Sequence, residues 1–356
     1  MTMIDDIETP CAVIDLDRVE RNLDRWQGYL DQHGIANRPH IKTHKLVRFT
    51  RMQLEKGASG IACQKLGEAE AMVEGLADLG PLDIMIPFNI LGAAKLARAA
   101  ALSQRCRLTL ACDNEAMVAP MGAAMANAGC EVGLVIEFDS GAGRCGVSSV
   151  EEAVDLAKMI ERTPGLSCRG FFTYPPVGAA SRVRAFFDDA TGRLKESGIE
   201  TDIRSNGGSP DMWRAHEVTN ATEHRAGTYI YFDRMQEKAG SGSFEDCALH
   251  VHATFVSRHG DRACIDAGSK SLTSDLGGLS GHGMIVEYPD ARIFRLSEEH
   301  GHVDLSASVT KPAIGERVRI VPNHVCPVSN LFDTVVLARG GEVVAIETVN
   351  ARGRVT

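Results

Sequence analysis

The stretch GIACQKLGEAEAMVEGLADLGPLDIMIPF (60–88) decides the fold. It contains two short, continuous apolar runs, GIACQ (60–64) and DIMIPF (83–88), and the segment between them has apolar residues near helical spacing. Continuous apolar runs are typical of parallel strands covered on both faces, and a glycine or proline commonly ends a helix. The stretch therefore predicts a strand, a helix and a second strand of one parallel sheet.

Similar apolar runs occur on both sides of this unit. They are CAVIDL (11–16), RPHIKT (38–43), RLTLACD (107–113), GLVIEFD (133–139), CRGFFTY (168–174) and DIRSNGG (202–208). Helical patterns such as DRVERNLDRWQGYLDQHG (17–34) and SSVEEAVDLAKMIERTPG (148–165) lie between them. Eight alternations of strand and helix predict an α/β fold of the (β/α)8 TIM-barrel type, whose active site lies at the carboxyl ends of the strands. An open, doubly wound sheet is the alternative.

After about residue 245 the pattern changes to alternating apolar and polar residues, separated by turn signals such as RHGD and RGGE. The alternating segments are ALHVHATFVSR (248–258), RACIDAG (262–268), RIFRLSEE (292–299), HVDLSA (302–307), GERVRIVPN (315–323) and DTVVLARGGEVVAIETVNARG (333–353). Such alternation is typical of antiparallel sheets. We therefore expect a barrel domain over residues 1–240, whose extreme N-terminus can pack with the second domain, and a C-terminal antiparallel β domain over residues 241–356.

Composition and charge narrow the class of partner. The 356 residues are 44% hydrophobic and carry a formal net charge of −9, which disfavours a nucleic-acid partner because phosphates are neutralised by clustered Lys and Arg. No stretch approaches the roughly 20 uninterrupted apolar residues that span a bilayer, and the N-terminus MTMIDDIETP is acidic where a signal peptide is basic. We expect a cytoplasmic enzyme that acts on a small molecule and has no membrane partner.

The ten cysteines form no CxxC pair and no regular framework. Most lie inside apolar runs, where a reduced cysteine behaves as a small buried hydrophobic residue. We expect this state for nine of them, and Cys326 is the exception.

Basic residues are concentrated in RPHIKTHK (38–45), which holds Arg38, His40, Lys42, His44 and Lys45 at the end of an expected strand. An interior strand is normally apolar, so an anionic or reactive group is expected to bind there. A lysine that loses its proton through burial and neighbouring cations can form a Schiff base with an aldehyde cofactor. A basic surface loop is the alternative.

Two glycine-bearing segments, SNGGS (205–209) and RAGTY (225–229), follow the last strand signals. Glycine lets backbone N–H groups close around a phosphate, and in barrels the loops after the seventh and eighth strands often do so. Together with a lysine at a strand end, these segments indicate a phosphorylated cofactor. Separately, each is also compatible with an ordinary turn.

Two further motifs suggest ligand-binding side chains. EFDSGAGRCGV (137–147) places Arg144 in a glycine-rich loop after a strand, where its guanidinium can hold a phenolate or carboxylate oxygen or form a surface salt bridge. VPNHVCPVSNLFD (321–333) contains His324 and Cys326, which on an extended strand would point to the same side and face one metal ion. Two ligands alone make an incomplete site, so a coincidental pair is the alternative.

As a set, these motifs resemble the family of D-threonine aldolases, D-serine dehydratases and D-3-hydroxyaspartate lyases, which are pyridoxal 5'-phosphate (PLP) enzymes with an alanine-racemase-type barrel of fold type III and a C-terminal β domain. The resemblance runs over nearly the whole chain, through TPCAVIDLD, RPHIKTHK, GIACQKLGEAE, GRCGV, SNGGS, AGTY, IDAGSKS, EEHG and PNHVCPVSNLFD in that order.

The resemblance implies a role for each matching residue. Lys42 would be the Schiff-base lysine and the catalytic residue, and Arg144 would lie near the phenolic oxygen of PLP. Tyr174 occupies the position of an aromatic residue close to the cofactor, and His324 and Cys326 occupy the metal-ligand positions of the β domain. The remaining implied cofactor-binding residues are His40, Ser205, Asn206, Gly207, Gly208, Ser209, Gly227, Thr228 and Tyr229.

Two departures from the family's aldolases concern the chemistry. The aldolases often carry His-x-Asp at the metal pair, whereas His324 and Cys326 are similar to the pair of the zinc-dependent dehydratases, and a thiolate favours zinc over manganese or magnesium. In TYPPVG, Pro175 and Pro176 replace a Tyr-His-Gly pattern. The general base that accepts the substrate's hydroxyl proton therefore cannot be assigned from the resemblance.

The resemblance implies a PLP- and divalent-metal-dependent lyase that acts on D-3-hydroxy amino acids. Retro-aldol cleavage of the D-threonine type, to glycine and an aldehyde, is the first expectation. A zinc-dependent D-serine or D-3-hydroxyaspartate dehydratase, giving a keto acid and ammonia, is the second. An amino-acid racemase and a non-catalytic PLP carrier are further alternatives. The resemblance also implies a homodimer.

Overall fold

The computed structural model describes residues 2–356, which form two compact units; Met1, where the expected barrel domain begins, lies outside the described residues. The barrel unit comprises Trp26–Lys42, Val47–Gly227 and Arg354–Thr356. The β unit comprises the residues up to Arg25 together with Thr43–Leu46 and Thr228–Gly353. Lys42 is therefore the last residue of one barrel segment, and Thr43 belongs to the β unit.

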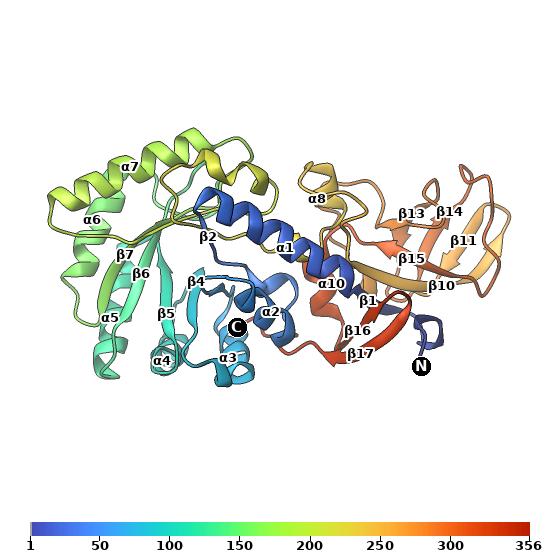
Figure 1. Ribbon diagram of the computed structural model, residues 1–356, viewed down its shortest axis with the longest axis horizontal. Helices are drawn as coiled ribbons and strands as arrows, with labels where there is room; N and C mark the ends of the chain where they lie inside the picture. The colour runs from blue at the N-terminus through green and yellow to red at the C-terminus, as the bar shows by residue number, and fades with distance from the viewer. Residues whose placement is uncertain (1) are drawn as a thin grey trace. The chain divides into compact units, whose positions relative to one another are not determined.

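The barrel unit is built on an eight-stranded parallel sheet in the order β2-β9-β8-β7-β6-β5-β4-β3 (Figure 1). A parallel bridge between His40 and Ala62 links the chain just after β2 to β3, at the other end of this order, so the sheet curls into a barrel. The expected fold class is confirmed. The strands are β2 (Ala36–Asn37), β3 (Ile61–Ala62), β4 (Asp83–Asn89), β5 (Arg107–Cys112), β6 (Val132–Glu137), β7 (Leu166–Phe172), β8 (Ile203–Asn206) and β9 (Glu223–His224).

Helices connect successive strands, and in Figure 1 α4 to α7 lie outside the strands that they connect. Helix α6 shows why these segments are helical: Ser149 caps it by accepting a hydrogen bond from the N–H of Glu152, and its buried residues recur at helical spacing. The helices are α1 (Leu16–His33), α2 (Val47–Glu55), α3 (Leu66–Gly75), α4 (Ala93–Ser103), α5 (Val118–Asn127), α6 (Val150–Glu161) and α7 (Ala180–Glu196), with short 3-10 helices at Ile4–Asp6, Ile41–Thr43, Ala77–Leu79, Glu115–Met117, Met212–Glu217 and Thr228–Ile230.

Apolar side chains from neighbouring strands form one core cluster of the barrel. It consists of Met85, Ala111, Val135, Phe172 and Ile203, which come from five consecutive members of the sheet and are at most 4% exposed. Each strand contributes one side chain, so the strands are held in register by packing as well as by the hydrogen-bonded ladder.

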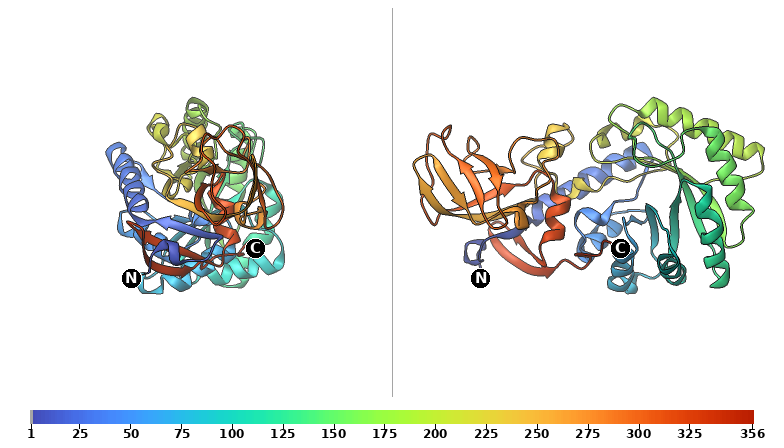
Figure 2. Two further views of the ribbon diagram at one scale, coloured as in Figure 1. Left: turned by 90° about the vertical axis from the view of Figure 1, so that its right-hand side faces the viewer. Right: turned by 180° about the vertical axis from the view of Figure 1, so that it is seen from behind.

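The β unit contains a mostly antiparallel sheet in the order β13-β14-β11-β10-β1-β16-β17, with β15 also paired to β10 and β12 paired to β15. The right-hand view of Figure 2 shows these strands, mainly in orange and red. They are β1 (Cys11–Asp15), β10 (Leu249–His259), β11 (Arg262–Ile265), β12 (Met284–Ile285), β13 (Arg292–Leu296), β14 (Gly301–Asp304), β15 (Arg317–Val321), β16 (Thr334–Arg339) and β17 (Glu342–Thr348), and the helices of this part of the chain are α8 (Arg234–Lys238), α9 (Ser269–Leu272) and α10 (Val325–Leu331).

Two expected barrel strands are different in the structure. CAVIDL forms β1 of the other sheet, where it pairs antiparallel with β10 and parallel with β16, and this central place explains its continuous apolar run. The eighth barrel strand is instead β9, whose two residues are too few to give an apolar signal. RPHIKT directly follows β2: His40 forms a single parallel bridge to Ala62 of β3, and Ile41–Thr43 form a 3-10 helix rather than a strand.

No helix within residues 2–356 combines the length and the apolar character needed to cross a membrane.

A glycine in β7 tests the packing of the barrel wall. Gly170 has φ +132°, and a Cβ built there would lie 2.0 Å from the carbonyl oxygen of Ile203 in β8. Gly170→Ala should therefore lower the free energy of unfolding by about 2 to 4 kcal/mol, measured by urea denaturation. Gly192→Ala in α7 is the control: it has open space around the added methyl and should raise stability by up to about 1 kcal/mol. Equal effects of the two substitutions would contradict the packing.

Candidate active site

The expected cofactor residues of the barrel unit lie at or just after the carboxyl ends of its parallel strands, with Ser205 and Asn206 as the last two residues of β8. They are His40 and Lys42 after β2, Arg144 after β6, Tyr174 after β7, Gly207 and Gly208 after β8, and Gly227 after β9. In a barrel of parallel strands these ends lie on one face, which is the face that carries active sites. The sequence motifs are thus gathered on the chemically useful side of the barrel.

Lys42 lies in the 3-10 helix that follows β2, and its amine points to Gln64. The Nζ of Lys42 donates to Oε1 of Gln64 at 3.2 Å, and Nε2 of His40 lies 3.0 Å from the same oxygen. Gln64 follows β3 and carries no charge, which is why the motif analysis missed it. Lys45 has a different environment, because its buried Nζ donates to the carbonyl of Ala351 at 3.2 Å.

The two glycine segments after β8 and β9 are joined to each other within the barrel unit. The Oγ of Ser209 accepts a hydrogen bond from the N–H of Gly227 at 3.3 Å. A Cβ on Gly207 (φ +116°) would lie 2.3 Å from the ring of His224, and one on Gly208 would lie 2.4 Å from Tyr174. Only glycine lets the backbone pass this close to two rings. The tight shape of the loop therefore depends on glycine at both 207 and 208.

Polar atoms at the end of β8 and β9 face a small pocket. Its lining includes Asn206, Gly207, His224, Pro175 and Pro176. The Oδ1 of Asn206 and the Nδ1 of His224 are buried there without a hydrogen-bond partner. Burial lowers the pKa of His224 to about 4, although a hydrogen bond to the carbonyl of Gly208 opposes the shift, so the ring is neutral at physiological pH.

Arg144 lies close to two residues of neighbouring strands. Its guanidinium is 3.6 Å from Oε1 of Glu137 and 5.1 Å from the centre of the Tyr174 ring, and its side chain is 56% exposed. Burial raises the pKa of Glu137, against the opposing charges of Arg144 and Arg225. Glu137 is the last residue of β6, and it fixes the direction of an arginine that would otherwise be mobile in a glycine-rich loop.

Glu137 also belongs to a cluster whose possible ligand atoms lie within 4.8 Å of one another, with Asp113 and Cys145. The carboxylate of Asp113 accepts from Nδ2 of Asn89 at 2.7 Å and from the N–H of Gly146 at 3.0 Å. Because Arg144 already pairs with Glu137, these groups order the arginine loop, and no further observation points to a bound ion.

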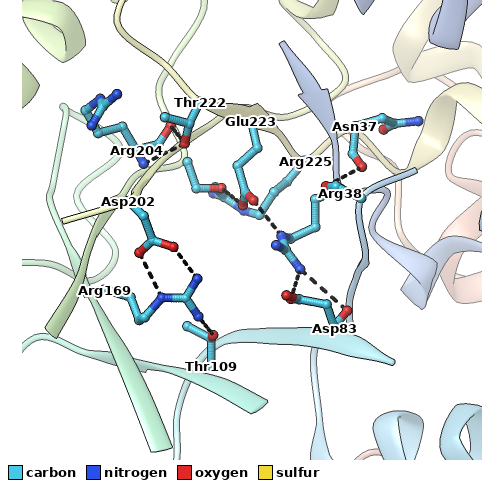
Figure 3. Close-up of polar contacts among 12 residues, drawn as sticks. Asn37, Arg38, Asp83, Thr109, Arg169, Asp202, Arg204, Thr222, Glu223 and Arg225 are labelled. Carbon is cyan, nitrogen blue, oxygen red and sulfur yellow. Dashed lines mark hydrogen bonds and ion pairs between the residues drawn. The ribbon is translucent and has the colours of Figure 1, made fainter. Parts of the chain in front are cut away.

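Beneath the loops, the barrel contains a buried ionic network (Figure 3). Oε2 of Glu223 accepts from Nε of Arg38 at 2.7 Å, and its Oε1 accepts from Oγ of Ser205 at 2.5 Å. Arg225 donates to the same Oγ at 2.5 Å, and Arg38 also pairs with Asp83 at 2.6 Å. Burial lowers the pKa of Arg225 to about 10, partly offset by Glu223, so it stays charged at neutral pH. The Ser205 hydroxyl is therefore part of this network.

Glu223, which lies two residues before the glycine segment RAGTY, and Arg225, which begins it, were not among the expected site residues. Arg225 also donates to the backbone carbonyl of Thr173 at 2.8 Å, and its guanidinium lies 5.1 Å from the Phe172 ring centre. The sequence signal that could have located the network is the run of three consecutive polar residues Glu223, His224 and Arg225. In the structure these residues are only 2 to 5% exposed.

In the β unit, His324 and Cys326 are brought together at the start of a helix and not on a strand. His324 is the N-cap residue of α10, and Cys326 lies in its first turn. Nδ1 of His324 donates to Oδ2 of Asp275 at 2.7 Å. Burial opposes the imidazolium, but hydrogen bonds to Cys326 and Asp275 outweigh it and raise the pKa of His324 to about 9.

Two threonines border the Cys326 thiol within the same unit. Oγ1 of Thr43 lies 3.2 Å from Sγ, and Oγ1 of Thr228 lies 3.9 Å from it. Thr43 follows Lys42 directly in the chain, and Thr228 follows Gly227. Tyr229, the next expected cofactor residue, is 1% exposed in the 3-10 helix Thr228–Ile230.

The ionic network generates a stability prediction. Glu223→Gln removes the carboxylate charge between two guanidinium groups that are 5% exposed. The substitution should lower the free energy of unfolding by about 3 to 5 kcal/mol, because it removes the carboxylate that compensates two buried cations, and only Arg38 keeps a direct ion pair, with Asp83. Glu217→Gln is the matched control: it breaks an exposed pair with Arg214 and should cost less than about 1 kcal/mol. Urea denaturation measures both, and a loss of under 1 kcal/mol for Glu223→Gln would refute the network's role.

Several lyases of known activity are similar to this chain over nearly its whole length. The chain is 33% identical to the D-threonine aldolase of an Arthrobacter species, over 98% of this chain and 93% of the relative. The D-threonine aldolase structure from Filomicrobium marinum matches with a TM-score of 0.91 at 28% identity, over 100% of both chains. The structure of D-threo-3-hydroxyaspartate dehydratase from Delftia sp. HT23 matches with a TM-score of 0.89 at 28% identity, over 98% and 99% of the two chains. A cysteine-to-alanine mutant of such a dehydratase was solved in a metal-free form.

Two family models divide the chain between them. The model of the alanine racemase N-terminal domain matches residues 14–235, which is more than half of the chain, and a model described as a putative serine dehydratase domain matches residues 248–338. These matches agree with the strand-end lysine and glycine loops of the barrel unit. The chain therefore belongs to the alanine-racemase-like family of PLP-dependent lyases, in the branch of D-threonine aldolases and D-serine and 3-hydroxyaspartate dehydratases.

Proposed function

We propose that this lyase acts on D-3-hydroxy amino acids and cleaves substrates of the D-threonine type to glycine and an aldehyde. The observation that carries the proposal is the end-to-end likeness to D-threonine aldolase, at a TM-score of 0.91. Lys42, the glycine loops and Arg144 follow the carboxyl ends of strands in the same barrel, which is where this chemistry requires them.

The residues at this face fit PLP. Gly207 and Gly208 leave the loop backbone without side chains, as backbone approaching a phosphate requires, and buried Asn206 has an unpartnered Oδ1 beside them. The amine of Lys42 could form a Schiff base with the aldehyde of PLP. The guanidinium of Arg144 offers a planar pair of donors for the phenolic oxygen of PLP. When bound, PLP withdraws electrons from the substrate's α-carbon and so stabilises the charge left by bond cleavage.

The chain's own residues would divide the remaining work. His40 and Gln64 orient the Lys42 amine, while Glu137 holds Arg144 toward the Tyr174 ring. Ser209, Gly227, Thr228 and Tyr229 remain proposed neighbours of the phosphate, whereas Ser205 acts from below through the ionic network. Pro175 and Pro176 supply no proton acceptor, so the base for the substrate hydroxyl is left unassigned.

His324 and Cys326 are the proposed ligands of a divalent ion. An imidazole backed by a carboxylate and a nearby thiol is a donor set that suits zinc better than manganese or magnesium. Such an ion supplies Lewis acidity for the substrate's β-hydroxyl. We also propose that the enzyme is cytoplasmic and, on the family resemblance alone, that it is a homodimer.

A D-serine or D-3-hydroxyaspartate dehydratase is the second candidate function, and Cys326 is the observation that favours it. The metal-free form of the cysteine mutant links a cysteine with the metal in a related dehydratase. In this reaction the β-hydroxyl leaves, and the products are a keto acid and ammonia. The presence of the Cys326 thiol does not by itself decide between an aldolase and a dehydratase, whereas an assay of the reaction products does.

The products distinguish the two functions directly. The PLP- and zinc-loaded protein should convert D-threonine to equal amounts of glycine and acetaldehyde, because the Cα–Cβ bond is the one that breaks. D-Serine and D-3-hydroxyaspartate should give less ammonia and keto acid than D-threonine gives glycine. Amino-acid analysis and a coupled ammonia assay measure the outcome, with the L-enantiomers as controls. Predominant keto acid formation would assign the dehydratase function instead.

Lys42 can be tested independently of activity. Borohydride reduction of the PLP-loaded protein should leave the pyridoxyl group on Lys42, located by peptide mapping, and Lys42→Ala should lose the visible absorbance of the bound cofactor. Lys45 is the nearest rival, but its amine is buried against the carbonyl of Ala351. A pyridoxyl group on Lys45 would overturn the assignment.

A further inference from the structure

Asp275 contacts His324, one of the two proposed metal ligands, at the ring nitrogen Nδ1. It lies between α9 and β12, and Oδ2 of its carboxylate accepts from Nδ1 of His324 at 2.7 Å. An imidazole presents one nitrogen to a metal ion and one to the protein. With Nδ1 engaged by Asp275, Nε2 is the nitrogen that can bind the ion.

The loop that carries Asp275 is held by hydrogen bonds on both sides. Oδ1 of Asp275 accepts from the N–H of Gly277 at 3.0 Å. Asn323, next to His324, donates to the carbonyls of Leu276 at 3.3 Å and Gly281 at 2.8 Å. The carboxylate and the imidazole are therefore fixed to each other through the backbone as well as through their own hydrogen bond.

A second carboxylate fixes the ligand backbone from another element. Oδ2 of Asp233 accepts from the N–H of Val325, the residue between His324 and Cys326, at 3.0 Å, while its Oδ1 caps α8 through Gln236. Asp233 is fully buried. With the backbone set in this way, the rotation of the His324 ring is the freedom that remains, and Asp275 restrains that rotation through its hydrogen bond to Nδ1.

We propose that Asp275 is a positioning residue of the metal centre, which holds the His324 ring with Nε2 toward the ion and increases the basicity of that nitrogen. The proposal rests on the proposed function, in which His324 and Cys326 bind a divalent ion. An exposed ion pair is the competing explanation, since the Asp275 side chain is 45% exposed. A pair of that kind would leave metal affinity unchanged.

The test is the zinc affinity of the full-length PLP-loaded protein, measured by competition with a chromophoric chelator. Asp275→Asn keeps the size of the side chain and an oxygen for Gly277, but it removes the charge. It should weaken zinc binding roughly 10- to 100-fold, as loss of such partners typically does. Asp290→Asn, at an exposed aspartate of the same unit, is the matched control and should stay within about twofold of wild type.

The outcomes separate this inference from the proposed function. If wild-type protein binds no stoichiometric zinc, the proposed metal site fails and the role of Asp275 fails with it. If wild type binds zinc and Asp275→Asn binds it equally well, only the positioning role is overturned. Nitrogen-15 shifts of His324 in the zinc-loaded wild type give a readout that needs no variant. They should show zinc on Nε2 and a proton on Nδ1, and the reverse assignment would also overturn the proposal.

Discussion

The carboxylate of Glu223 joins two arginines and a serine inside the barrel, and the three loops of the candidate site depend on that contact. Arg38 begins the lysine segment RPHIKTHK, Ser205 begins SNGGS, and Arg225 begins RAGTY. All three bind directly or through one atom to Glu223. The first residue of each loop is therefore held in a fixed position, and this limits the positions that the following residues can take.

This arrangement explains why the barrel contains charge where apolar side chains would be sufficient for stability. Removing ions from water is expensive, and an apolar replacement of a complete buried network is often neutral or stabilising. A guanidinium, however, has directed donors that packing cannot imitate. We interpret the network as a means of positioning. It links the ends of strands β2, β8 and β9 to one carboxylate, next to the loops that carry the proposed site residues.

Elements with strong local signals could be predicted from the sequence, and elements set by distant contacts could not. The strand, helix and second strand of residues 60–88 were predicted correctly, because apolar runs and helical spacing are local properties of the sequence. β1 was assigned to the wrong sheet, because a central strand of either sheet has the same apolar run. β9 was missed because two residues leave no pattern, and α10 replaced an expected extended segment because Pro327 does not prevent a first helical turn.

The candidate site shows the same division. Lys42, Arg144 and the glycines stand in recognisable motifs, whereas Gln64, Glu137 and Asp275 act through partners that only folding brings near. Asp275 lies 49 residues from His324 in the chain, and no local pattern links the two. Polar residues that orient other residues have no type or spacing of their own, so sequence motifs point to the proposed cofactor and metal ligands but not to the residues that hold them.

The pairing of β1 has a consequence for how the chain folds as it is made. Cys11 pairs with His252, and Val13 pairs with Val336, so the first strand has no partner until β10 has been made and no second partner until β16 has been made. At roughly 5 to 20 residues per second, its wait is on the order of 10 to 60 s. The barrel strands, whose partners mostly follow one another in sequence, can assemble during that interval.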